Sequence, residues 1–191
     1  MVDFAHHTEW PFCWYAVDAL DREPIRFLSH LVTSITMQFP LFGKRSRAVL
    51  QNMAQGELNL DTMVSAVIQD MFEAINEHFV IVLDDYHLIE ESEPVAHFIS
   101  RLVQDSDENC HVILTSRTLI ALPDLPLMVA RSLVGGLGAE DLAFTPQEVQ
   151  AFFRQTLRQA IPESLAYELA RLSEGWITGL LLSSQLADMG I

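Results

Sequence analysis

Phe-Val-Ile-Val-Leu-Asp-Asp at residues 79–85 decides the fold, because an unbroken apolar run there ends in two carboxylates. A strand with one face in water alternates apolar and polar side chains, whereas a strand covered on both faces of a parallel sheet is apolar throughout. Residues 79–85 therefore predict a strand that is covered on both faces of a parallel sheet. The segments Pro-Phe-Cys-Trp-Tyr-Ala-Val-Asp at 11–18 and Cys-His-Val-Ile-Leu-Thr-Ser-Arg at 110–117 are also short and apolar, and they predict two further strands.

The segments between these strands have helical spacing. Pro24 stands where a first helical turn would begin, and a missing N–H costs little there. The apolar residues that follow it at helical intervals are Ile25, Leu28, Leu31, Val32 and Ile35. Further helices are predicted over 46–54, from Asp61 as N-cap to about residue 75, and over 92–104. The order strand–helix–strand–helix–strand implies right-handed crossovers and an open α/β sheet.

The pattern changes in the last third of the chain. Residues 121–143 are rich in Pro and Gly and include a possible short strand near 129–134. Beyond them the strand signals stop, and Thr145 followed by Pro146 and an acidic first turn is typical of a helix start. Three helices are predicted here, at 145–157, 162–173 and 176–187. The sequence therefore predicts an α/β core over 1–143 and a small all-α subdomain over 144–191.

Composition excludes several classes of protein. The 191 residues include 26 Asp and Glu against 11 Lys and Arg, giving a net charge of -15, and 50% are hydrophobic. A chain this acidic lacks the clustered cations that neutralise phosphates, so no direct nucleic-acid binding by this region is expected. No apolar run approaches the ~18–20 residues that span a bilayer, and no secretory signal is present, so we expect a cytoplasmic location and no membrane partner.

Candidate functional residues follow the predicted strands directly. Asp84 and Asp85 end the strand predicted at 79–85, and Thr115-Ser116-Arg117 ends the strand predicted at 110–117. Ligands of open parallel sheets bind outside the carboxyl ends of the strands. Two adjacent carboxylates there suit Mg²⁺ and the orientation of an attacking water, and a guanidinium suits a γ-phosphate. A solvated strand end and a surface arginine are the alternatives that these residues leave open.

The phosphate-binding loop expected beside such a site is missing. A P-loop reads G-x-x-x-x-G-K-[ST] between a strand and a helix. The single lysine, Lys44, follows Gly43, but Gln38 occupies the first glycine position and Arg45 the hydroxyl position. Gly-Gly-Leu-Gly at 135–138 does not continue into a dinucleotide fingerprint either. No His or Cys spacing resembles a zinc site.

Several ordered motifs resemble the MalT-type regulators, which belong to the LuxR-type, ATP-dependent group of bacterial transcriptional activators and carry a signal-transduction (STAND) ATPase. Phe79–His87 resembles their Walker B run and His111–Arg117 their sensor strand, with its Thr-Ser-Arg ending. The other matching motifs are Trp14-Tyr15-x-x-Asp18, Pro24-x-x-Phe27-Leu28-x-x-Leu31, Ala139–Thr145 and Glu174-Gly175-Trp176. The resemblance extends from about Phe4 to Leu186. It implies a partial P-loop NTPase-type parallel sheet with flanking helices, followed by a helical subdomain.

The resemblance also implies residue roles. Asp84 would serve Mg²⁺, Asp85 would activate or sense water, and Arg117, next to Thr115, would contact the γ-phosphate of ATP. Gly175 would belong to the adenine-side Gly-x-Pro motif, in which Ile177 here replaces the proline. The Walker A segment, the signal-sensing repeats and the DNA-binding domain have no counterpart in this sequence.

Two functional hypotheses follow. In the first, the chain is a fragment of the ATP/ADP-switch module of such a regulator, uses Mg²⁺, and acts with the remainder of the regulator or other protomers in response to an inducer that the sequence does not reveal. Weak or absent nucleotide binding and no catalysis are expected of this chain alone, because backbone N–H groups and the P-loop lysine supply the main hold on phosphates. In the second, it is a nucleotide-independent protein-interaction domain on a degenerate NTPase fold.

Overall fold

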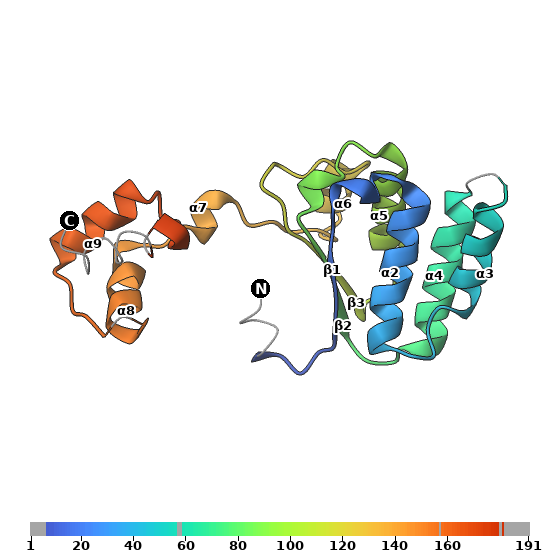
Figure 1. Cartoon of the computed structure of the whole chain (residues 1–191), viewed down its shortest axis with the longest axis horizontal. Helices are drawn as coiled ribbons and strands as arrows, with labels where there is room; N and C mark the ends of the chain where they lie inside the picture. The colour runs from blue at the N-terminus through green and yellow to red at the C-terminus, as the bar shows by residue number, and fades with distance from the viewer. Residues whose placement is uncertain (1–6, 57–58, 157, 180, 182–191) are drawn as a thin grey trace. The chain divides into compact units, whose positions relative to one another are not determined.

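The chain folds as two compact units, Met1–Val134 and Gly135–Ile191 (Figure 1). The structure, a computed structural model, describes residues 7–56, 59–156, 158–179 and 181. The division between the units follows Val134, whereas the sequence analysis placed the start of the helical subdomain at residue 144. Within the described residues, no helix is both long and apolar enough to cross a bilayer.

The first unit is built on three parallel strands in the order β1-β2-β3: β1 (Phe12–Ala16), β2 (Phe79–Asp84) and β3 (Cys110–Leu114). The register pairs Cys13 with Ile81 and Ile81 with Val112. β2 lies in the centre with its first five residues buried, as its apolar run predicted. The partial α/β fold with a parallel sheet is therefore confirmed.

The predicted helices of this unit are also confirmed: α2 (Pro24–Gln38), α3 (Lys44–Met53), α4 (Leu60–Ala74) and α5 (Glu93–Asp105). One cap differs from the prediction. Asn59, not Asp61, is the N-cap of α4, and its side-chain oxygen accepts a hydrogen bond from Thr62 N–H at 2.9 Å. Asn59 has the extended backbone that a cap requires, whereas Asp61 already lies inside the first turn.

The strand predicted near 129–134 is wrong. The short helix α6 (Leu125–Ala130) occupies part of this range, and no strand follows it. Pro126 lies in its first turn, where its fixed φ suits a helix and its missing N–H is no loss. Only Met128 of α6 is buried, and a single buried side chain is too little apolar contact to distinguish strand from helix in the sequence.

The main hydrophobic core lies between one face of the sheet and helices α2–α5 (Figure 1). From the sheet it takes the alternate side chains Cys13 and Tyr15 of β1 and Phe79, Ile81 and Leu83 of β2. On the other face Val80 and Val82 are buried but lie outside this core, and Trp14 is 36% exposed. β3 is half-buried along its whole length, and no described strand pairs with its second edge.

A buried carboxylate joins α4 to the start of α3. The N-cap of α3 is Gly43, which has φ 94° and no side chain to cap the helix. Asp70 of α4 replaces it: its carboxylate, 3% exposed, accepts hydrogen bonds from Arg45 N–H at 3.1 Å and Ser46 N–H at 2.8 Å. The Ser46 hydroxyl donates a third bond at 2.7 Å. Asp70 thus satisfies N–H groups that a helix start leaves without partners.

The second unit contains α7 (Ala139–Leu142), α8 (Pro146–Thr156) and α9 (Glu163–Leu172) around a small core of Val149, Phe153 and Ala166. The predicted start of α8 at Thr145 is confirmed by reciprocal bonds: Thr145 N–H donates to Glu148 Oε2 at 2.8 Å, and Glu148 N–H donates to Thr145 Oγ1 at 3.3 Å. Of the third predicted helix, residues 177–179 and 181 are helical, and 182–187 lie outside the described residues.

We expect Asp70→Ala to lower the free energy of unfolding of the first unit by about 2–3 kcal/mol, because it leaves buried donors at Arg45 and Ser46 without an acceptor. Urea unfolding followed by circular dichroism measures the change. Asp61→Ala on the same helix is the matched control, since the Asp61 side chain is 73% exposed and its ion pair with Arg101 contributes little. Equal losses in the two variants would contradict this role of Asp70.

Candidate functional site

The carboxyl ends of the three strands meet at one edge of the sheet. Asp84, the last residue of β2, pairs with Ala16 of β1, and its carbonyl accepts from Val17 N–H at 3.0 Å. On the other side, Thr115 N–H donates to Leu83 O at 3.0 Å. The structure therefore brings Asp84, Asp85 and Thr115 together, as the parallel register requires.

Thr115 connects the two carboxylate residues. Its hydroxyl donates a hydrogen bond to Asp84 Oδ1, and its Oγ1 accepts from Asp85 N–H at 3.1 Å. Its carbonyl also accepts from Tyr86 N–H at 2.9 Å. One Asp84 oxygen is therefore held in place, while Oδ2 has no hydrogen-bond partner within the described ranges.

Asp85 turns the chain sharply at the end of β2. Its backbone is left-handed, with φ 61° and ψ 38°, a conformation that Asp and Asn adopt more readily than other residues with a side chain. The short 3-10 helix η2 (Tyr86–Leu88) follows at once. The Asp85 side chain is 49% exposed, so it faces the solvent side of the edge rather than the core.

Arg117 lies just past β3 in the loop that leaves this edge. The loop is tied to the one that follows β2, because the Thr118 hydroxyl donates to Glu90 Oε2 at 2.7 Å and lies 3.1 Å from Ser116 Oγ. Arg117 itself is exposed and makes no hydrogen bond or ion pair with the part of the chain that the structure describes. Its guanidinium is thus free to bind an anion at the edge.

Two residues that directly follow Asp85 carry buried polar atoms without partners, and no sequence motif pointed to them. Tyr86 Oη and His87 Nδ1 have no hydrogen-bond partner among the described residues. Burial, and secondarily Glu90, raises the pKa of Tyr86 to about 12, so its hydroxyl stays protonated and could donate. His87 Nδ1 is 3.8 Å from Asp85 Oδ1. Unpaired buried groups are rare in folded proteins, and the one on His87 lies close to a carboxylate of the candidate site.

The donor set fits Mg²⁺ and not a metal held by protein ligands alone. Mg²⁺ is bound by one or two carboxylates and keeps several waters or substrate phosphates as ligands. Asp84 and Asp85 supply such carboxylates, and the described residues contain no group of three or more His, Cys, Asp or Glu side chains that could hold a metal ion.

The single lysine, Lys44, lies at the opposite end of the sheet, where it begins α3. It follows Phe39, whose ring centroid is 5.5 Å from that of Phe79.

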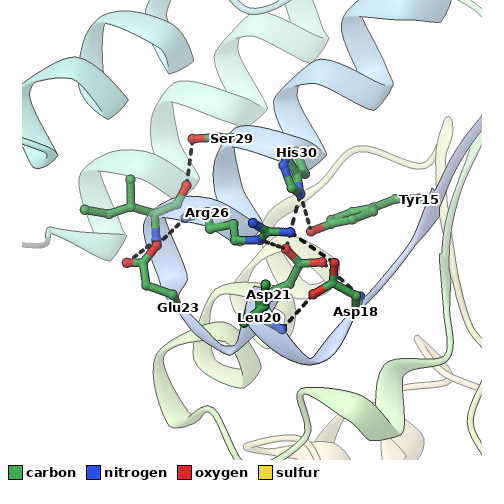
Figure 2. Close-up of polar contacts among 9 residues, drawn as sticks. Tyr15, Asp18, Leu20, Asp21, Glu23, Arg26, Ser29 and His30 are labelled. Atoms are coloured by element: carbon green, nitrogen blue, oxygen red, sulfur yellow. Dashed lines mark hydrogen bonds and ion pairs between the residues drawn. The ribbon is translucent and has the colours of Figure 1, made fainter.

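The turn after β1 is fixed at the same edge by a network around Asp21 (Figure 2). Asp21, 1% exposed, accepts from Asp18 N–H at 2.9 Å and Arg26 Nε at 2.8 Å, and lies 3.2 Å from His30 Nδ1. Burial alone would raise the pKa of Asp21, but hydrogen bonds from Asp18 N–H, Arg26 and Tyr15 outweigh it and hold this pKa below its usual range. The reciprocal Asp18 and Asp21 bonds form a capping box that the three-residue spacing could have signalled.

The sequence has relatives among known proteins. The chain is similar to "HTH-type transcriptional regulator MalT" of Serratia proteamaculans (32% identity over 173 residues), Yersinia enterocolitica (31% over 172) and Vibrio campbellii (30% over 169). Each match covers 88% of this chain and 18% of the relative, so the chain spans about one fifth of the length of the curated relatives that it matches. No protein-family model matches.

The chain resembles the MalT regulators over 88% of its length. The resemblance found from its motifs is thereby confirmed, whereas the roles of Asp84, Asp85, Thr115, Arg117 and Gly175 stay predictions.

Gly175 of this MalT-like chain lies in the second unit at a close backbone contact. It has φ 72°, and its carbonyl accepts from Phe144 N–H at 2.9 Å. A Cβ at this position would lie 2.6 Å from Ala143 Cβ and 2.7 Å from Phe144 N, closer than side chains approach. Gly175 therefore has a structural reason to be glycine, and Ile177 begins a helix directly after it.

We expect Asp21→Asn to weaken the dependence of stability on acid. A carboxyl whose pKa is lowered in the folded state contributes stability above its unfolded pKa of about 3.9, and this stability is lost as the pH falls through the folded value. The variant should melt at a lower temperature than wild type at pH 7 and lose less between pH 5 and 2. Melting curves across that range measure both effects. Glu91→Gln is the control, since the Glu91 side chain is 76% exposed. If Glu91→Gln changed the pH dependence of melting as much as Asp21→Asn does, the assignment of this dependence to Asp21 would be refuted.

We expect Gly175→Ala to destabilise the second unit by about 1–3 kcal/mol, through strain at a positive φ and the close contact with Ala143 and Phe144. Amide hydrogen exchange in α8 and α9 reports the change. Gly136→Ala is the matched control, because a Cβ there meets nothing within 4 Å. Unchanged protection in Gly175→Ala would show that the backbone contact tolerates a side chain.

Proposed function

We propose that this chain is part of the nucleotide switch of a MalT-like, LuxR-type transcriptional regulator, and that it supplies the residues on the magnesium and γ-phosphate side of that switch. The observation that carries the proposal is the edge at which Thr115 holds Asp84 and Asp85 beside an unpaired Arg117. The MalT regulators to which the chain is similar support the assignment to transcriptional regulation.

Asp84, Asp85 and Arg117 have different roles in the proposed site. Asp84 binds Mg²⁺ directly or through water, because Thr115 fixes its Oδ1 and leaves Oδ2 available. Bound Mg²⁺ neutralises charge on the nucleotide phosphates. Asp85, at the turn and half-exposed, orients a water molecule or senses its displacement. Arg117 donates to the terminal phosphate, for which its fork of N–H groups is well suited.

The sheet has an open position for the part of the site that is not present here. A further parallel strand beside the free edge of β3 would bring its carboxyl end next to Thr115 and Arg117. The two present crossovers move across the sheet from β1 toward β3, whereas a right-handed crossover from that strand to β1 would move across the sheet in the opposite direction. Its helix would therefore pack on the face that carries Trp14. A phosphate-binding loop at that position would complete the site.

The second candidate is a nucleotide-independent interaction domain. Ile177 in the Gly-x-Pro position and the missing P-loop motif favour it. The exposed apolar side chains of the second unit favour it too: Tyr167 and Trp176 are 62% exposed and Leu172 is 69% exposed. In this case the carboxylate edge would be a solvated strand end.

The two candidates differ in what Mn²⁺-ATP does to the amide resonances of this chain. We expect Mn²⁺ with millimolar ATP to broaden the resonances of Asp84, Asp85 and Thr115–Arg117 selectively, since paramagnetic Mn²⁺ takes the place of Mg²⁺. We expect no ATP turnover by the chain alone, because its residues include no phosphate-binding loop.

Asp84→Ala should abolish the broadening. The broadening should be stronger with ATP than with AMP, because Arg117 donates to the terminal phosphate, and Arg117→Ala should remove this difference. Glu91→Gln should change neither result. Broadening spread over the acidic surface, or the same broadening in Asp84→Ala, would overturn the nucleotide-switch proposal and favour the interaction domain.

A further inference from the structure

Two histidines and a tryptophan form a compact cluster at the amino ends of the strands, the end of the sheet opposite Asp84. His78 directly precedes β2 and His111 is the second residue of β3. His78 Nδ1 and His111 Nε2 are 3.1 Å apart. The indole of Trp10 stacks on both imidazoles, with ring centroids 5.1 Å from His78 and 4.5 Å from His111.

The backbone fixes the two histidines in place. Phe79 N–H, next to His78, donates to Asn109 O at 3.0 Å, and the Asn109 side-chain amide donates to Ile75 O at 3.2 Å and Glu77 O at 3.3 Å. The segment before β2 is thus bound to the segment before β3. Stacking on Trp10 keeps the imidazole planes within 24° of each other. Both side chains are therefore oriented before any ligand binds.

We propose that His78 Nδ1 and His111 Nε2 form a binding site for a divalent late transition metal ion such as Zn²⁺ or Cu²⁺. Nitrogen ligands lie ~2.0–2.1 Å from Zn²⁺, so two of them at angles near 90–110° are roughly 2.8–3.4 Å apart. The observed 3.1 Å separation falls in that range. A rotation of each ring turns both lone pairs toward one ion. The proton on the donor nitrogen of the present hydrogen bond moves, through solvent, to the other nitrogen of the same imidazole, so that both ligands remain neutral.

The chemistry of the cluster separates it from the carboxylate edge. Imidazole nitrogen prefers Zn²⁺, Cu²⁺ and Ni²⁺, whereas Mg²⁺ prefers oxygen. Since no third His, Cys, Asp or Glu joins such a group in the described ranges, water completes the coordination, and the ion is exchangeable rather than structural. The net charge of -15 raises the local concentration of cations.

Calorimetric titration of the untagged chain with ZnCl₂ in 10 mM Mg²⁺ tests the proposal. We expect one equivalent of Zn²⁺ to bind. His78→Gln and His111→Gln should each weaken binding at least tenfold, because one imidazole cannot chelate. In parallel, Cu²⁺ should quench tryptophan fluorescence in wild type and much less in Trp10→Phe, since Trp10 stacks on both proposed ligands.

The controls separate this site from other histidines and from the carboxylates. His97→Gln, whose side chain on α5 is 47% exposed, Asp84→Ala, and the double variant His6→Gln/His7→Gln should bind Zn²⁺ as wild type does. Undiminished binding by both His78→Gln and His111→Gln, or no binding of Zn²⁺ at 1 mM, would overturn the proposal. If His111→Gln fails to fold, His78→Gln and the Zn²⁺-induced shifts of the imidazole nitrogen resonances in wild type still decide the outcome.

Discussion

The right-handed crossover between parallel strands is the constraint on which the first unit depends. β1, β2 and β3 lie side by side in chain order, so both connections turn in the same sense and helices α2–α5 pack on one face. That packing buries Phe79, Ile81 and Leu83 in the main core. The same order brings all three carboxyl ends to one edge, which is why Asp84 and Thr115 can meet across 31 residues of sequence.

Buried or half-buried carboxylates in this unit differ in how completely the fold satisfies them. Asp21 and Asp70 are almost inaccessible, and each accepts several hydrogen bonds from nearby N–H or O–H groups. Within the described residues, Asp84 has one oxygen without a hydrogen-bond partner, and His87 contributes an unpaired ring nitrogen near Asp85. A carboxylate with a structural role is thus recognised by the several donors that bind it. The candidate site is recognised by polar atoms that the fold leaves without hydrogen-bond partners.

Local pattern predicted what depends on neighbours in sequence. The uniform apolar run at 79–83 identified the central strand, and the Thr145 and Pro146 signal identified the start of α8. Contacts that depend on register or on packing between elements were not predictable, and these include Asp70 capping α3 and the His78–His111 pair. The mistaken strand at 129–134 arose because the short apolar run that ends at Ala130, with one buried side chain, is too short to distinguish a strand from a helix.

The unpaired edge of β3 affects the lifetime of the protein in the cell. The edge of β3 that pairs with no described strand offers free N–H and C=O groups, as the surface of an incompletely folded chain does. Chaperones and proteases continuously remove such chains. A strand that covers that edge would therefore lengthen the lifetime of the protein in the cell.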